Sequence, residues 1–332
     1  MRYIIIGAGA VGGTIGARLH EGGHEVVLVA RGAHLAALRA EGLRFGTPEG
    51  VRTLRIPAAG GPPEVELRAD DVLVLAVKTQ DTAAALAAWA PCPVAGGGTA
   101  AERLPLVCAQ NGVENERLAL RLFREVLAMC VWMPSTHLAP GRVSAGGTPV
   151  SGVLRLGGYP SGTGGPRAAA IAADLGASGF NAPVEADVMS WKYAKLLGNL
   201  GNALDAVAGQ RGDEALRALQ ERVGAEGAAV LAAAGIAHRD PAEQARAVRE
   251  SLRLAPVDGE RRSGSSSWQS LARGTGSIEA DHLNGEIALL ARLHGVAAPL
   301  NEALQRLAGE FARTGRAPGS LTDRELAALT AL

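Results

Sequence analysis

A glycine-rich loop near the start of the chain constrains the fold more than any other stretch. Residues 7–13 read GAGAVGG, directly after the apolar run YIII at 3–6. A helical pattern, TIGARLHEGG, follows, and then a second apolar run, EVVLVAR, at 25–31. This order of strand, glycine turn, helix and strand predicts a βαβ unit, from which parallel sheets are built.

The glycines of this loop have the spacing G-x-G-x-x-G. In a βαβ unit they allow a tight turn, close approach of the backbone to a pyrophosphate and close helix–strand packing, while the helix N-terminus favours the phosphate charge. We therefore predict a dinucleotide site; the alternative is a purely structural glycine turn. The predicted cofactor-binding residues of the loop are Gly7, Ala8, Gly9, Ala10, Val11 and Gly12.

The end of the second strand indicates which dinucleotide to expect. An NAD site usually has a carboxylate there, bound to the ribose 2′-hydroxyl, whereas this strand ends VLVARGAH with Arg31 in that place. A guanidinium pairs with a 2′-phosphate, so the sequence predicts NADP(H). Because 30 of the 33 basic residues are arginine, a solvated surface arginine is the alternative.

Further apolar runs continue the α/β pattern, because runs of six or so apolar residues suit strands buried on both faces of a parallel sheet. The expected strands lie at 70–78, 104–110 and 126–132, the expected helices at 114–123 and 166–178, and a short hairpin at 141–158.

The character of the chain changes after about Asp187, where long Ala/Leu/Arg helical patterns such as DEALRALQERVGAEGAAVLAAAG begin to dominate. A chain of 332 residues also exceeds the size that one hydrophobic core usually reaches. We therefore predict an α/β protein of two domains. Residues 1–186 form an NADP-binding, Rossmann-like doubly wound sheet, and residues 187–332 an all-helical substrate and catalytic domain.

Composition argues against several classes of protein. The formal net charge is zero, so bulk electrostatics favour neither nucleic acid nor an anionic membrane as a partner. No stretch approaches the roughly 18 apolar residues of a membrane span, and glycines interrupt the N-terminal run that otherwise resembles a secretory signal. Three cysteines without close spacing fit neither a disulfide framework nor a metal site, so we expect a cytoplasmic protein with reduced thiols.

A polar stripe marks WKYAKLLGNLGNALDA, residues 191–206, which reads as a helix. At about 100° per residue, Asn199 and Asn202 fall within roughly 40° of Lys195. The chain has three lysines against 30 arginines, and a lysine can give up a proton once its surroundings lower its pKa, whereas arginine cannot. Lys195 is therefore a candidate proton donor; a lysine extending along an amphipathic face to solvent is the alternative.

Two further candidates follow predicted strands. Asn111, in the sequence QNG, comes directly after one strand, and Lys78 ends the strand before it. Cofactors bound to parallel sheets meet their substrates at this edge, although an ordinary Asn-Gly turn is the alternative. Near the C-terminus, SGSSSWQSLARGTGSIEADHLNGE supplies hydroxyls and Glu279; a stretch of this composition is more often a loop than a site.

Taken together, these features resemble the ketopantoate reductase (2-dehydropantoate 2-reductase) family over nearly the whole chain. The resemblance depends on the order and spacing of short motifs, none of which is decisive alone. The motifs are GAGAVG, VK at Lys78, QNG at Asn111, W-x-x-x-K-x-x-x-N from Trp191 to Asn199, SS at Ser266–Ser267 before Glu279, E-x-D-x-x-N-G at 279–285 and HGVAAPLN at 294–301.

The resemblance implies an enzyme that uses NADPH to reduce 2-dehydropantoate to pantoate, a step of pantothenate biosynthesis. Lys195 would be the general acid that protonates the carbonyl oxygen as hydride arrives. Glu279 would orient the substrate and the Lys195 network, and Asn199 and Ser267 would hold substrate oxygens.

The resemblance also assigns residues to the cofactor. Asn111 would lie between nicotinamide and substrate, Lys78 would lie near the cofactor, and Arg31 matches the family's contact to the 2′-phosphate. A positioned ammonium such as that of Lys195 suits the reaction, because hydride addition builds negative charge on the carbonyl oxygen.

One position departs from the family pattern. The family commonly has a second substrate-facing Asn eight residues after the lysine, but position 203 is Ala here and the amide falls one residue earlier, at Asn202. On a helix, an offset of eight points about 80° from Lys195 and an offset of seven about 20° the other way. Asn202 is thus a candidate for a different part of the substrate, and ketopantoate itself is put in question.

Other functions remain open from the sequence. A β-hydroxyacid dehydrogenase also has a K-x-x-x-N helix but usually carries a GLGxMG loop, and Tyr193 and Lys195 do not form the Y-x-x-x-K of short-chain dehydrogenases. The enzyme alternatives are therefore reduction of another 2-oxo acid or oxidation of a 3-hydroxy acid. A non-catalytic NADP-binding sensor module is an alternative of another class, and apolar helix faces are compatible with a homodimer.

Overall fold

The computed structural model describes residues 1–209, 213–260, 264–274 and 276–332, so Ser263 and Thr275 of the serine-rich stretch lie outside it. The chain divides into two compact units. The first comprises Met1–Lys192 and Ala242–Arg262, and the second Tyr193–Pro241 and Ser263–Leu332. The boundary proposed from composition, at 186–187, falls just before the helix in which the two units divide.

The first unit is built on a seven-stranded sheet, in the order β12–β8–β7–β6–β1–β2–β5. All of its pairings are parallel except that between β12 and β8. Its strands are β1 (Arg2–Ile6), β2 (Glu25–Val29), β5 (Ala58–Ala59), β6 (Asp71–Leu75), β7 (Leu106–Cys108), β8 (Val126–Trp132) and β12 (Val153–Gly158). The strands predicted from the four N-terminal apolar runs and from 126–132 are thereby confirmed.

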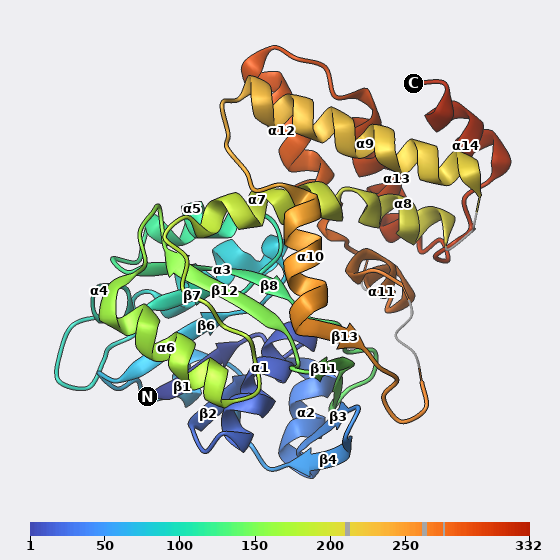
Figure 1. The fold of residues 1–332 in the computed structure, drawn as a ribbon. Coiled ribbons are helices and arrows are strands. Elements are labelled where there is room, and N and C mark those ends of the chain that lie inside the picture. Colours follow the sequence, from blue (N-terminus) through green and yellow to red (C-terminus); the bar gives the residue numbers. More distant parts are fainter. Residues whose placement is uncertain (210–212, 261–263, 275) are drawn as a thin grey trace. The chain divides into compact units, whose positions relative to one another are not determined.

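Helices alternate with these strands along the chain, and Figure 1 shows them around the sheet. They are α1 (Ala10–Glu21), α2 (Gly32–Glu41), α3 (Thr82–Trp89), α4 (Ala100–Arg103), α5 (Asn115–Leu120), α6 (Gly165–Ala177) and α10 (Pro241–Ser251), with 3₁₀ turns η1 (Pro62–Glu64) and η2 (Thr79–Asp81). The helices predicted at 114–123 and 166–178 correspond to α5 and α6.

The sheet is buried on both faces, which explains its continuous apolar runs. Tyr3 and Ile5 of β1 pack in a core with residues of α1 and α6. Ile4 and Ile6, between them, pack in a second core with residues of α3, α4 and α5. The period of two along a strand therefore supplies both layers, and the predicted doubly wound α/β class is confirmed.

The hairpin predicted at 141–158 is wrong. Its halves are β10 (Arg142–Ala145) and β12, which pair with different sheets: β10 with β3 and β9, and β12 with β8. Local alternation does not specify the partner of a strand, and here β3, one of the partners of β10, is distant in sequence. The smaller sheets contain β3 (Leu43–Thr47), β4 (Gly50–Leu54), β9 (Ser135–Thr136) and β10, and a pair of β11 (Gly147–Pro149) with β13 (Leu252–Leu254).

The second unit, in the residues that the structure describes, consists of helices. They are α8 (Gly201–Ala208), α9 (Glu214–Ala233), α11 (Ser266–Ala272), α12 (Asn284–His294), α13 (Pro299–Thr314) and α14 (Asp323–Thr330), with the 3₁₀ turn η3 (Glu279–His282). The helical character predicted for this part of the sequence is confirmed. The segment of α10 and β13, in contrast, belongs to the first unit, which the sequence pattern did not indicate.

The helix predicted over 191–206 is interrupted. Helix α7 (Val188–Asn199) ends just before Leu200, and α8 begins at Gly201. Leu200 keeps helical angles (φ −60°, ψ −30°), and its N–H donates to the carbonyls of both Leu196 and Leu197. The chain thus continues in a right-handed sense through a locally tightened turn. A Cβ on Gly201 would lie 2.7 Å from Nε2 of Gln220 in α9, so a side chain here would displace that of Gln220.

Candidate active site

The glycine loop has the geometry that its sequence predicts. Gly7 has φ +102°, and a Cβ there would lie 2.8 Å from the backbone nitrogen of Val77. A Cβ on Gly12 would lie 2.1 Å from the Gly7 carbonyl oxygen. A Cβ on Gly9, in contrast, would meet no described atom within 4 Å. Gly7 and Gly12 are thus required by packing, whereas Gly9 leaves an open approach at the N-terminus of α1, as a bound pyrophosphate would need.

Arg31 lies at the carboxyl end of β2, where it precedes the first residue of α2. Its side chain is 78% exposed, and Nη2 lies 3.4 Å from Oδ1 of Asp81 at the end of η2. Arg31 follows strand β2 along the chain, and Asp81 follows strand β6. An exposed guanidinium at this strand end can bind a phosphate, but the neighbouring carboxylate competes for it.

Lys78 and Asn111 follow the adjacent strands β6 and β7, and a hydrogen-bond network joins their two loops. Gln110 donates through Nε2 to the Val77 carbonyl at 2.9 Å and to the Thr82 hydroxyl at 2.8 Å. Asn115 donates through Nδ2 to the Asn111 carbonyl at 3.1 Å. The loops carrying both predicted residues are therefore held together at one edge of the first unit's sheet.

Sequence reasoning missed the buried ion pair below this edge. Lys192 of α7 is 3% exposed, Glu116 of α5 is fully buried, and the two side chains form a salt bridge. The Lys192 ammonium also donates to the Gln110 carbonyl at 3.0 Å, so the pair holds the turn that leads into Asn111. The sequence signal for Lys192 is the scarcity of lysine in this chain, which it shares with Lys195.

In the second unit, the polar side chains of the stripe lie on and after α7. Lys195, Asn199 and Asn202 are each partly buried. The Nδ2 of Asn199 is buried and, among the described residues, has no hydrogen-bond partner. Because an unpaired buried donor is costly, this amide is suited to bind an oxygen of a ligand.

Ser265, the residue that caps the N-terminus of helix α11, binds this helix to α8. The backbone N–H of Ser265 donates to Oδ2 of Asp205 at 2.8 Å, and its side chain donates to the Asn202 carbonyl at 3.4 Å. Ser267 lies in the first turn of α11 and is 3% exposed. These contacts place the predicted Ser267 on an element that packs directly against the one carrying Asn202.

Glu279, the first residue of η3, is 5% exposed. Its charge acts on Arg273 at the end of α11: burial lowers the pKa of the Arg273 guanidinium, and the Glu279 carboxylate opposes that effect. Arg273 is thus a charged residue close to the predicted Glu279. The sequence did not indicate it, because arginine is common throughout this chain.

Two Asn residues of the C-terminal motifs stabilise the break between α7 and α8. Asn284 donates through Nδ2 to the Leu200 carbonyl and to Oδ1 of Asn301, each at 3.0 Å. Asn301 in turn donates to the Val223 carbonyl and to Glu226 of α9. These residues lie in E-x-D-x-x-N-G and HGVAAPLN, so the two motifs hold the turn between Asn199 and Asn202.

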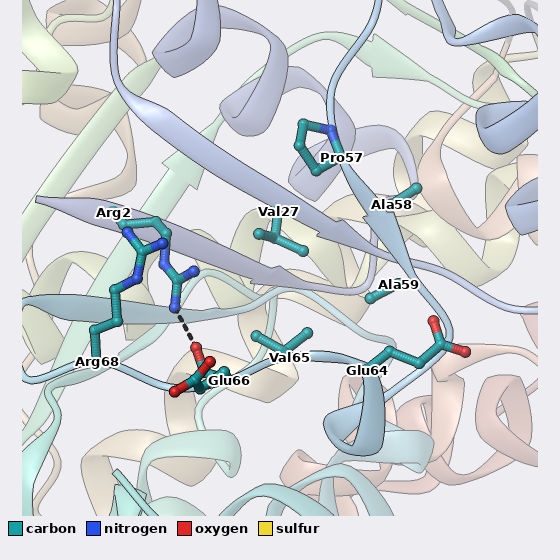
Figure 2. Close-up of a pocket in the computed structure, with 9 residues that line it drawn as sticks. All are labelled: Arg2, Val27, Pro57, Ala58, Ala59, Glu64, Val65, Glu66 and Arg68. Atoms are coloured by element: carbon teal, nitrogen blue, oxygen red, sulfur yellow. Dashed lines mark hydrogen bonds between the residues drawn. The ribbon is translucent and has the colours of Figure 1, made fainter. Parts of the chain in front are cut away.

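A surface hollow of about 310 Å³ lies elsewhere in the first unit. Figure 2 shows Arg2 and Arg68 on one side of it and Glu64 on the other, with Val27 and Val65 between them. Three of the four charged side chains that line it have partners: Arg2 binds Asp71, Arg68 lies 3.0 Å from Glu25, and Glu64 pairs with Arg39. The hollow includes none of the predicted site residues.

Within the described residues, no group of three or more His, Cys, Asp or Glu side chains could hold a metal ion. The three cysteines are free thiols, and burial raises the pKa of the Cys108 thiol well above its ordinary value. No helix in the same residues is long and apolar enough to cross a membrane.

The doubly wound sheet, with its glycine loop at the start of α1, defines the Rossmann-like class of α/β proteins. The model of the family described as "Ketopantoate reductase PanE/ApbA" matches residues 3–160, and that of its C-terminal region matches residues 187–312. The chain belongs to the ketopantoate reductase family and is an oxidoreductase.

Relatives over most of the chain agree with this membership. The 2-dehydropantoate 2-reductase of Mesorhizobium japonicum is 31% identical over 265 residues, which cover 71% of this chain and 77% of that protein. The enzyme of the same name from Halobacterium salinarum is 30% identical over 328 residues, which cover 95% of this chain and 100% of that protein.

Solved structures share the fold. A PanE/ApbA family ketopantoate reductase from Ralstonia eutropha has a TM-score of 0.76 and 30% identity, with 95% of this chain and 100% of that chain covered. D-mandelate dehydrogenase bound to NADH and anilino(oxo)acetate has a TM-score of 0.77 at 22% identity, with 95% and 99% covered. Membership of this reductase family supports a nicotinamide cofactor, while the individual roles of the site residues stay predictions.

Proposed function

We propose that this protein reduces a 2-oxo acid with NADPH, most closely 2-dehydropantoate to pantoate. Family membership supports the reaction class. The observation that carries the proposal is the free space beside Gly9, which lies between two glycines that packing requires. This space would let a pyrophosphate reach the N-terminus of α1. We propose residues 1–186 as the cofactor-binding domain and 187–332 as the domain that supplies the acid and the substrate ligands.

Arg31 supports NADPH over NADH in this proposal. Its guanidinium is exposed at the end of β2, where the 2′-phosphate of the cofactor would bind. When bound, the nicotinamide supplies the hydride. Lys78 and Asn111, which follow β6 and β7, would line the cofactor at the same sheet edge.

The second unit would supply the proton. Hydride addition converts the carbonyl oxygen to an alkoxide, and Lys195 would stabilise this charge and donate a proton from Nζ to that oxygen. The unpaired Nδ2 of Asn199 would donate to a substrate oxygen, and so would the Ser267 hydroxyl. Glu279 would orient the substrate and the ammonium.

Substrate choice is the finer part of the proposal. Asn202 takes the place of the amide that the family commonly has at position 203, where this chain has a buried Ala. A 2-oxo acid whose side chain differs from that of ketopantoate is therefore the alternative substrate. A 3-hydroxy acid ranks below it, because the loop reads GAGAVG and not the GLGxMG usual in β-hydroxyacid dehydrogenases. A non-catalytic NADP-binding module also ranks below it, because the chain has a complete set of candidate acid, carboxylate and amide residues.

The direct test is NADPH oxidation in the presence of ketopantoate and a panel of branched and aromatic 2-oxo acids. We expect turnover with at least one, and ketopantoate to have the highest kcat/KM. Failure of every acid to support oxidation, with folded protein that binds NADPH, would favour the sensor module instead.

Replacing Lys195 separates its role as an acid from its charge. Lys195→Arg keeps a cation that cannot donate a proton near neutral pH, and Lys195→Met removes the charge. We expect both to lower kcat by about 10² to 10⁴-fold, the usual contribution of general acid catalysis, with NADPH affinity unchanged. Steady-state kinetics and fluorescence titration measure the two quantities; near-normal kcat in Lys195→Arg would exclude Lys195 as the acid.

A further inference from the structure

His34 connects the glycine loop to two other segments of the first unit. It lies in the first turn of α2, three residues after Arg31. Its Nε2 lies 2.8 Å from the Ala8 carbonyl oxygen in the glycine loop. Its Nδ1 lies 2.9 Å from the backbone nitrogen of Gly141, which precedes β10. One side chain thus bridges residues that are 26 and 107 positions away from it in sequence.

The partners of His34 determine its tautomer. A backbone N–H can only donate, so Nδ1 accepts the hydrogen bond from Gly141. A carbonyl oxygen can only accept, so Nε2 carries the proton and donates to Ala8. The imidazole is therefore neutral, in agreement with a pKa that burial lowers, although the Ala8 carbonyl opposes this effect. The ring also contacts that of His137, with the ring centroids 4.3 Å apart and the ring planes tilted by 49°.

The bond to Ala8 fixes the orientation of the next peptide N–H. The carbonyl of Ala8 and the N–H of Gly9 belong to one planar peptide, in which they point in opposite directions. Because His34 holds the carbonyl, the Gly9 N–H is directed away from His34. The two preceding amides, of Gly7 and Ala8, both donate to the Val29 carbonyl, at 3.1 and 2.9 Å. Gly9 is thus the first residue of the loop whose amide does not bind this carbonyl.

We propose that His34 is a positioning residue for cofactor binding, which sets the Ala8–Gly9 peptide so that the Gly9 amide donates to the cofactor pyrophosphate. The inference rests on the proposed use of a nicotinamide dinucleotide. It adds a residue that neither the glycine motif nor the family resemblance assigns. His34 also joins this loop to the helix whose start carries Arg31, so one residue coordinates the pyrophosphate loop with the predicted 2′-phosphate contact.

Two substitutions each keep one of the two hydrogen bonds. In His34→Gln, the side-chain amide nitrogen takes the place of Nε2 and can donate to Ala8. In His34→Asn, the side-chain oxygen takes the place of Nδ1 and can accept from Gly141, but the bond to Ala8 is lost. Both variants lose the ring, so packing against His137 changes in both; His137→Asn is the control that changes the ring contact while His34 keeps both bonds.

NADPH affinity is measured by fluorescence titration, together with amide hydrogen exchange over residues 7–12 in the cofactor-free protein. We expect His34→Gln and His137→Asn to bind within about twofold of wild type. His34→Asn should bind on the order of tenfold more weakly, because a buried carbonyl loses its donor, and its loop should exchange faster. At saturating NADPH, kcat and the KM for the 2-oxo acid should be the same in all variants, as expected of a residue that acts only through the cofactor loop.

Equal affinities of the Gln and Asn variants would overturn the inference, and so would unchanged exchange of the loop in His34→Asn. Melting temperatures decide whether weak NADPH binding reflects unfolding. His34→Gln and His34→Asn each lose one of the two hydrogen bonds of His34, so we expect the two variants to have similar melting temperatures. A wild-type protein that binds neither NADPH nor NADH would refute the proposed function itself. Wild-type binding combined with indistinguishable variants would refute the role of His34 alone.

Discussion

At the scale of single residues, the glycine loop shows that one motif contains positions of different kinds. Gly7 and Gly12 are required because a side chain would collide with backbone atoms of the protein itself. Gly9 is free of such collisions, so we predict that glycine is needed there for the ligand. The sequence identifies the motif but does not separate these reasons, because all three positions are glycine.

Alanine at Gly9 should therefore affect mainly NADPH binding, and alanine at Gly12 mainly the free energy of unfolding. Gly9→Ala should change the free energy of unfolding by less than about 1 kcal/mol but weaken NADPH binding at least tenfold, since the added methyl occupies the approach to the amides. Gly12→Ala should cost roughly 1–3 kcal/mol of stability, because its Cβ would lie 2.1 Å from the Gly7 carbonyl oxygen. Urea unfolding and NADPH titration measure both.

The matched control for these two changes is Gly176→Ala in α6, where a Cβ also meets no described atom within 4 Å. It should leave NADPH affinity unchanged. Tight NADPH binding by Gly9→Ala would show that the cofactor does not approach this position.

Arg31 should determine the preference between the two nicotinamide cofactors. Arg31→Ala should weaken NADPH binding about 10- to 100-fold, the loss expected of a charge-assisted hydrogen bond, and leave NADH binding unchanged. Asp81→Asn should strengthen NADPH binding, because the carboxylate 3.4 Å from Arg31 repels the phosphate. Titration with each cofactor measures these affinities.

Arg39→Ala is the control on the same helix, because Arg39 is an exposed arginine paired with Glu64. It should change neither affinity. If Arg31→Ala weakened NADPH and NADH binding equally, Arg31 would contact a part common to both cofactors, and the assignment to the 2′-phosphate would be wrong.

At the scale of elements, the most informative contact is the buried pair of Lys192 and Glu116, which joins α7 to α5 and to the turn before Asn111. Arginine is the usual cation of this chain, but its guanidinium is larger than an ammonium, and both side chains here are almost completely buried. Lysine is therefore explained by packing at position 192, whereas at position 195 the proposed explanation is proton transfer.

Breaking this pair should destabilise the protein strongly. Lys192→Met leaves a buried, uncompensated carboxylate and should cost about 3–5 kcal/mol of unfolding free energy. The double variant Lys192→Met with Glu116→Gln should recover part of the loss, because no buried charge then remains. Urea unfolding of the wild type, the single variants and the double variant gives the coupling energy.

The matched control is the exposed pair of Arg167 and Glu125, whose side chains are 44% and 37% exposed. Arg167→Met should cost no more than about 1 kcal/mol, as is typical of a surface pair. A loss of similar size for the two pairs would contradict the structural role assigned to Lys192.

At the scale of the whole molecule, binding and stability are linked. A ligand that binds only the folded state stabilises it by about 2.7 kcal/mol at a concentration 100 times its Kd. NADPH at that concentration should therefore raise the melting temperature of the wild type. Gly9→Ala, at the same NADPH concentration, should show a smaller increase, because tenfold weaker binding leaves about 1.4 kcal/mol of stabilisation. Calorimetry measures both, and a wild-type melting temperature unaffected by NADPH would contradict the predicted cofactor site.

The sequence by itself determined the class of the fold and the position of the glycine turn between β1 and α1. Apolar runs, glycine spacing and helical periodicity are local patterns. They sufficed for five strands of the large sheet, for α1, α5 and α6, and for the helical character of the second unit. The order of the motifs also sufficed for the family. These properties depend on residues close together in the chain, whose conformational preferences and burial pattern can be read directly.

Only the tertiary structure decided the remaining features. The pairing of β10 with β3, the hydrogen bond from Asn284 at the break after α7, the salt bridge between Lys192 and Glu116, and the two hydrogen bonds of His34 all join segments far apart in the sequence. Glu116 and Lys192, for example, are 76 positions apart. No local pattern specifies such a pairing, because a side chain's partner depends on how the elements pack, and packing is settled by the hydrophobic core as a whole.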